Sequence, residues 1–180
     1  MTGSRREPAG FTVPAAPQRH EAPHVGDERS TLEGFLEYHR TTFARKVEGL
    51  GTEQLRRRSV EPSSMSLLGL VRHLADVERV WWQAGVAGED VRARYWSDAD
   101  PDGEFDRVEE ADPVHDLAEL ATQQDLARAV LAAHDLDDTF EHRQGTTSVR
   151  WVLAHLVEEY ARHNGHADLL RERIDGATGE

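Results

Sequence analysis

Glu159 and His163 could bind a metal ion together, because they lie four positions apart in a segment with helical periodicity. Residues at this spacing are neighbours on one face of a helix. Each residue turns the helix by about 100°, so Glu159 lies about 40° from His163, whereas Glu158 points to the outer face. Carboxylate and imidazole groups both bind zinc and related divalent ions. We therefore predict Glu159 and His163 as metal ligands.

The position of His163 within an apolar stripe favours this prediction. The stripe follows steps of three and four residues and contains Val149, Val152, Leu156, Tyr160, Ala167, Leu170 and Ile174. An ionised Glu159 that faces a bundle interior is costly unless it is paired, and a cation would be a suitable partner. His166 lies about 60° from His163, on the same side as Glu159, and is a candidate catalytic base. The alternative is a Glu159–His163 surface pair at the rim of the helix.

A third ligand should come from another helix, and His73 is the candidate. It lies at the edge of an apolar stripe formed by Leu67, Leu70, Leu74, Val77, Trp81 and Ala84, where a side chain can face a cleft between helices. Glu78 falls within the same stripe and is a candidate catalytic base or alternative ligand. His39 and His155 could also take part. For each histidine the alternative is a core side chain with a hydrogen-bonded neighbour.

Four helices would have to position these side chains, and the hydrophobic periodicity predicts them at about 30–50, 67–84, 113–134 and 148–174. Residues 86–112 are rich in Asp, Glu and Gly and indicate a long connection with a short helical turn. The chain shows no strand-like alternation. We expect an all-α four-helix bundle over residues 30–176, preceded by a disordered or loosely packed tail over residues 1–29.

The composition excludes several classes of function. The net charge of −13 argues against nucleic acid as a partner, because phosphate binding requires a basic surface. No apolar run is long enough to span a bilayer. No apolar segment follows Arg5 and Arg6, so we read no secretion signal and expect a cytoplasmic protein. The chain has no cysteine, so any nucleophilic sulfur would have to arrive on a cosubstrate.

Two segments resemble motifs of the DinB-like superfamily. Residues 66–78, SLLGLVRHLADVE, look like the second-helix motif, and residues 151–166, WVLAHLVEEYARHNGH, look like the fourth-helix motif. The resemblance covers residues 30–175. It is closest to an uncharacterised DinB subfamily and to the mycothiol-dependent maleylpyruvate isomerases. Members of the superfamily are four-helix bundles that often form dimers.

The resemblance implies a divalent-metal site with His73, Glu159 and His163 as ligands. Many relatives have histidine at both fourth-helix positions, whereas the isomerases have the Glu-x-x-x-His version found here. The implied metal is zinc, with nickel, manganese or iron as alternatives. Three protein ligands leave a coordination position open, which is typical of catalytic zinc. The resemblance also implies mycothiol as a thiol cosubstrate.

We therefore expect a thiol-dependent transferase or isomerase that acts on a small electrophile in a cleft bounded by residues 86–112. Trp81, Trp82, Tyr95 and Trp96 could line this cleft. Two alternatives stay open: a metal-dependent hydrolase that uses bound water with His166 or Glu78 as base, and a non-catalytic metal-binding interaction protein. We also expect two protomers to associate, because relatives often dimerise and four tryptophans exceed what one small core needs.

Overall fold

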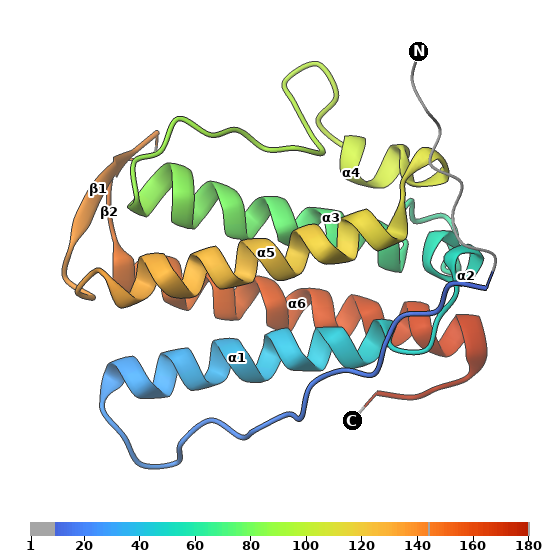
Figure 1. The fold of residues 1–180 in the computed structure, drawn as a ribbon, viewed down its shortest axis with the longest axis horizontal. Helices are drawn as coiled ribbons and strands as arrows, with labels where there is room; N and C mark the ends of the chain where they lie inside the picture. The colour runs from blue at the N-terminus through green and yellow to red at the C-terminus, as the bar shows by residue number, and fades with distance from the viewer. Residues whose placement is uncertain (1–9, 144, 180) are drawn as a thin grey trace.

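Four long helices dominate the computed structural model, which describes residues 10–143 and 145–179 (Figure 1). They are α1 (Glu28–Val47), α3 (Leu67–Glu78), α5 (Pro113–Ala132) and α6 (Val149–Asp175). The chain of α3 continues as a π-helix over Arg79–Val86. The shorter helices are α2 (Thr52–Arg56), α4 (Gly103–Asp106) and a 3-10 turn (Val108–Glu110). The predicted all-α architecture of the DinB-like kind is confirmed.

The long connection between α3 and α5 determines the direction in which α5 runs. Figure 1 shows α1 and α6 running in one direction and α3 and α5 in the other, so the chain must return along the bundle between α3 and α5. α6 packs against both α1 and α3, and α3 packs against α5. The core between these helices contains Phe43, Leu70, Leu74 and Leu156, each 1% exposed or less. No helix in the described residues has the length and apolarity needed to cross a membrane.

Polar caps fix where the helices begin. Ser66 accepts a hydrogen bond from the Gly69 amide at the start of α3, and Ser148 accepts one from the Trp151 amide at the start of α6. Pro113 occupies the first turn of α5, as predicted. The first helix begins at Glu28, earlier than the predicted residue 30, because the Asp27 side chain accepts a hydrogen bond from the Ser30 amide and caps the helix.

A β-hairpin between α5 and α6 was absent from our prediction. β1 (Thr139–His142) and β2 (Gly145–Ser148) pair antiparallel, with Thr139 opposite Ser148. Each strand has only four residues and little apolar alternation, so the periodicity carries almost no strand signal. The hairpin leads directly into α6 and contacts the π-helix, which places it beside the predicted metal ligands.

The described part of the N-terminal segment, residues 10–27, runs as extended chain beside α1 (Figure 1). Val13 exchanges backbone hydrogen bonds with Leu50 and Gly49, and the side chains of Val13 and Ala22 are 8% exposed. Most other side chains of this segment are exposed, as expected for a loosely packed tail. Residues 1–9 of the predicted tail lie outside the described residues.

A charged network crosses the core between α1, α3 and α6. The Arg40 guanidinium donates to both carboxylate oxygens of Glu78, at 2.8 and 2.6 Å, and the Tyr160 hydroxyl donates to the same carboxylate at 2.8 Å. Gln124 donates to the Tyr160 hydroxyl at 3.0 Å. Glu78 is fully buried, so these partners compensate for a charge that would otherwise be costly.

Candidate metal centre

The packing of α3 against α6 brings His73, Glu159 and His163 together. One potential ligand atom from each side chain lies within 4.8 Å of the other two. Glu159 Oε2 lies 3.3 Å from His163 Nε2 and 3.7 Å from His73 Nε2. The two imidazole rings are 4.6 Å apart between centroids. The Glu159 carboxylate therefore lies between the Nε2 atoms of His163 and His73.

Burial and hydrogen bonding give this cluster unusual electrostatics. Close contacts with the imidazoles of His163 and His73 hold the pKa of Glu159 well below its usual range, against the effect of burial. Burial lowers the pKa of His73, but the nearby carboxylates of Glu104 and Glu159 outweigh it and raise that pKa to about 9. Arg162 donates to Glu159 Oε1 at 3.4 Å from the exposed side. Between Glu104 and Glu159, the position of His73 therefore favours a positive charge, which an imidazolium proton or a metal cation can supply.

The residues present fit a divalent ion. His73 Nε2 is buried and has no hydrogen-bond partner in the described structure, although it points toward Glu159. Two imidazoles and one carboxylate form a ligand set that zinc accepts in catalytic sites. The residues that would hold the ion are the three expected from the sequence, His73, Glu159 and His163, and their binding of a metal stays a prediction.

The predicted difference between Glu158 and Glu159 is visible in their exposure. The Glu158 side chain is 57% exposed and pairs with Arg162, whereas the Glu159 side chain is 12% exposed. The helical phase deduced from the apolar stripe therefore agrees with the geometry.

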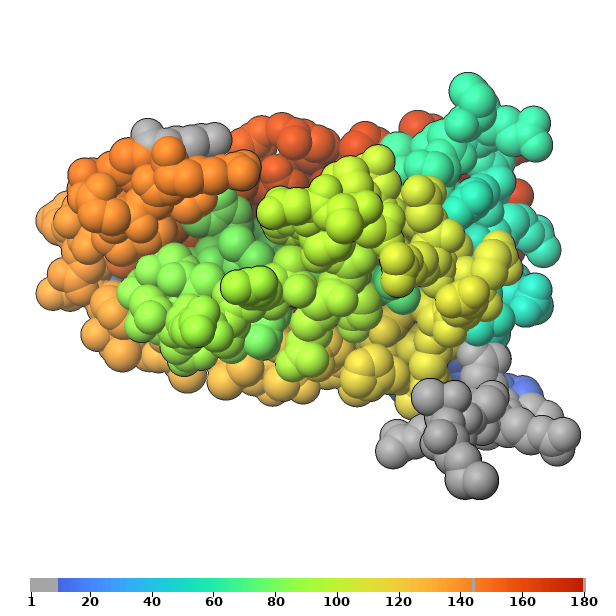
Figure 2. Space-filling view, turned by 90° about the horizontal axis from the view of Figure 1, so that it is seen from above, coloured from blue at the N-terminus to red at the C-terminus, as the bar shows by residue number. Residues whose placement is uncertain are grey.

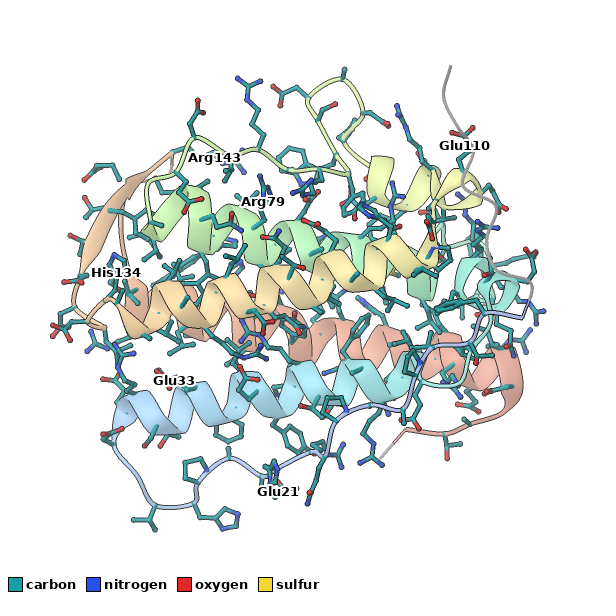
Figure 3. All side chains as sticks on the ribbon, in the orientation of Figure 1. Glu21, Glu33, Arg79, Glu110, His134 and Arg143 are labelled. Carbon is teal, nitrogen blue, oxygen red and sulfur yellow. The ribbon has the colours of Figure 1, made fainter. Side chains whose placement is uncertain are left out.

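A cleft of about 600 Å³ opens beside the cluster. Its lining includes the cluster residues His73 and Glu159, and an apolar wall formed by Val77, Val80, Trp81, Trp96 and Pro101. Figure 2 shows the hairpin (orange) and the connection after α3 (lime) on either side of a hollow, with α3 (green) at its base. Arg143 and His142 complete the rim from the hairpin, at whose tip Arg143 lies (Figure 3).

Two of the four aromatic residues that were predicted to line the cleft do so, and the other two pack elsewhere. Trp81 lines the cleft and contacts the rings of His142, His155 and Trp151 at centroid distances of about 5 Å. Trp96 also lines the cleft. Trp82 is a core residue, 1% exposed. Tyr95 is absent from the cleft lining and donates its hydroxyl to Asp116.

The other predicted site residues lie around the cluster. His166 lies behind His163, with its Nδ1 3.3 Å from the His163 Nδ1, on the opposite side of that ring from Glu159. His155 lines the cleft and lies 3.9 Å from Glu159. His39 contacts Asn164 instead of the cluster. The Glu78 carboxylate is bound to Arg40 and Tyr160, so those contacts hold it apart from the ligand atoms.

Glu104 is a site residue that the sequence prediction missed. Its Oε1 lies 3.3 Å from His73 Nδ1, and its side chain is 7% exposed. The acidic connection contains Asp98, Asp100, Asp102, Asp106, Glu109 and Glu110 as well. With so many carboxylates, spacing alone singles out none of them. The adjacent Phe105, an apolar residue in a polar segment, was the one available sign that this turn packs inward.

The chain is similar to a known protein family. A family model described as mycothiol-S-transferase matches residues 31–176, which include all three predicted ligands and the whole bundle except the first three residues of α1. No curated protein matches the chain.

Proposed function

The chain belongs to the mycothiol-S-transferase family, a DinB-like family, and on this premise we propose that it joins mycothiol through its sulfur atom to a small electrophile. His73, Glu159 and His163 would hold the divalent ion, with zinc the best match to two imidazoles and a carboxylate. When bound, such an ion favours the thiolate form of the cosubstrate. The single observation that carries the proposal is the buried two-helix ligand cluster at the base of a substrate-sized cleft.

The absence of cysteine from the sequence supports an external thiol. In the transfer, the electron pair of sulfur forms a bond to the electrophilic carbon, and the leaving group departs with its own bonding pair. The proton lost by the thiol balances the charge of the leaving group. The chain's residues would position the two reactants in the cleft, which raises the rate by proximity and orientation.

The cleft walls indicate which part of each reactant they would contact. The apolar wall of Trp81, Trp96 and Val80 suits an electrophile with an apolar body. The polar rim with His142 and Arg143 suits the hydroxyl and amide groups of a sugar thiol.

The contacts of the two candidate bases favour thiol transfer over metal-assisted hydrolysis. Glu78 is bound to Arg40 and Tyr160 in the core, and His166 lies behind His163. Neither residue belongs to the cleft lining, where a base for an attacking water would have to lie.

The test is a thiol-consumption assay with zinc-loaded protein, mycothiol and 1-chloro-2,4-dinitrobenzene as a model electrophile. We expect the wild-type chain to accelerate conjugate formation with mycothiol more than with free cysteine. His163→Ala should abolish the acceleration, whereas Glu158→Ala, at the exposed neighbour, should retain it. Equal rates for the wild type and His163→Ala would contradict the proposal, as would hydrolysis of an ester probe in the absence of any thiol-dependent reaction.

A further inference from the structure

The connection between α3 and α5 inserts one carboxylate, Glu104, behind His73. Its Oε1 lies 3.3 Å from His73 Nδ1, which is the ring nitrogen opposite the one that faces Glu159. The residue is 6% exposed, and its Oε2 is buried without a hydrogen-bond partner among the described residues. A buried, half-satisfied carboxylate is costly to a fold, so its position calls for a reason other than stability.

Contacts on both sides fix the turn that carries Glu104. Arg72 donates to the Gly103 carbonyl at 3.3 Å, and Arg58 donates to the Phe105 carbonyl at 3.0 Å. The Phe105 ring stacks on His73 with centroids 5.8 Å apart. Phe105 also packs so closely on α3 that a Cβ added at Gly69 would lie 2.6 Å from its ring. The carboxylate is therefore held in place by the short α4 helix instead of reaching His73 by chance.

We propose that Glu104 is a positioning residue, which keeps the His73 proton on Nδ1 and so leaves the Nε2 lone pair available to a metal ion. A neutral imidazole carries one proton, and a carboxylate beside Nδ1 selects the tautomer in which Nδ1 donates. His163 has the His166 imidazole beside its Nδ1 instead. Among the described residues, Glu104 is therefore the only one whose carboxylate lies behind a ligand imidazole of this cluster. The inference rests on the metal site in the proposed function.

The experiment measures zinc affinity by competition with a chromophoric chelator, together with thermal unfolding of the metal-free protein. Glu104→Ala should weaken zinc binding by about 10–100-fold, the usual loss when the partner of a ligand imidazole is removed. Glu104→Gln keeps an acceptor oxygen but loses the charge, so its loss should be smaller. Glu110→Ala removes an exposed carboxylate at the far end of the same connection and should leave the affinity unchanged (Figure 3).

Two further readouts separate positioning from a structural role. Above pH 9, where His73 is neutral and no longer pairs with Glu104 as a cation, the metal-free Glu104→Ala protein should unfold at the wild-type temperature or higher, because the substitution removes a half-satisfied buried charge. Nitrogen-15 spectra of the zinc-loaded wild type should show His73 protonated at Nδ1. If Glu104→Ala does not fold, the affinity and spectra of Glu104→Gln carry the test.

The outcomes distinguish this inference from the proposed function. Wild-type zinc affinity in Glu104→Ala overturns the positioning role and leaves the metal site standing. A lower unfolding temperature in Glu104→Ala with unchanged affinity overturns it as well. A wild-type protein that binds no zinc overturns both proposals. A protein with the expected zinc affinities but no thiol transfer supports the positioning role and contradicts the proposed function.

Discussion

At the residue scale, the three ligand side chains should contribute unequally to metal binding. His163→Ala should lower both zinc content and stability, because it leaves Glu159 buried with one fewer partner for its charge. Glu159→Gln keeps the shape of the side chain and removes the anion, so it should weaken zinc binding with less damage to folding. Elemental analysis of untagged protein and thermal unfolding measure the two effects.

Glu158→Ala is the matched control, since that side chain is mostly exposed and lies one residue from the ligand. It should change neither zinc content nor stability. A Glu158→Ala protein without zinc, beside a Glu159→Gln protein that keeps it, would show that the ligand assignment is wrong.

His166→Ala should retain zinc with a reduced affinity. The His166 ring contacts the His163 Nδ1 and does not face the point between the ligand atoms. Removal of such a neighbour typically costs about 10–100-fold in affinity or activity. Complete loss of zinc from His166→Ala, measured by the same chelator competition, would identify it as a ligand in its own right.

The stability of the metal-free protein should fall as the pH rises from about 6.5 to about 9. The folded-state pKa of His73 is raised from 6.5 to about 9, so its protonated form stabilises the fold fully below pH 6.5, and this contribution is lost as the pH rises through 9. The size should be on the order of 2 kcal/mol. Chemical unfolding in the presence of a chelator measures it.

His73→Gln should remove most of this pH dependence, whereas His115→Ala, at an exposed histidine, should leave it in place. Metal affinity should change in the opposite direction over the same range, because binding displaces the His73 proton. A metal-free protein whose stability rises between pH 6.5 and 9 would contradict the assigned hydrogen bonds of His73.

At the element scale, the Arg40–Glu78 pair joins α1 to α3, and Tyr160 adds α6 to the same network. Glu78→Ala leaves the buried Arg40 guanidinium with only the partly exposed Glu37 carboxylate, and should destabilise the protein by about 3–5 kcal/mol. Zinc content should persist in the folded fraction, because Glu78 does not contact the ligand atoms. Denaturant unfolding, with elemental analysis of the folded protein, tests both statements.

Asp125→Ala is the control for this substitution, because Asp125 pairs with Arg128 at the surface and is 79% exposed. Exposed pairs contribute about 0–1 kcal/mol, so this variant should unfold close to the wild type. A Glu78→Ala protein of normal stability that has lost zinc would show that Glu78 takes part in the metal site, as we predicted from the sequence.

The elements that could be predicted from sequence are those with long apolar periodicity. Leu70, Leu74 and Leu156 recur at helical spacing and are buried, and the same phase separated Glu159 from Glu158. Each hairpin strand and α4 has only four residues, too few for a period to appear. Glu104 could not be singled out, because its role depends on a contact 31 positions away that the Phe105 packing creates.

At the scale of the whole molecule, association of two protomers stays a prediction. Its sequence argument was the number of tryptophans, but Trp82 lies in the core and Trp81 and Trp96 line the cleft. Trp151, 46% exposed, and Leu169, 58% exposed, are among the large apolar side chains that an interface could cover. Light scattering should give about twice the chain mass of 20.2 kDa, and the single-chain mass across micromolar concentrations would contradict association.

The cleft draws its parts from two different regions of the chain. The three predicted ligands belong to α3 and α6, whereas Trp96, Pro101, His142 and Arg143 come from the connection and the hairpin. Loops of this kind accept substitutions and insertions more readily than packed helices do. Mutation can therefore change the lining of the cleft while the helices that carry the predicted ligands stay unaltered, so one ancestral scaffold could present clefts of different shape and chemistry.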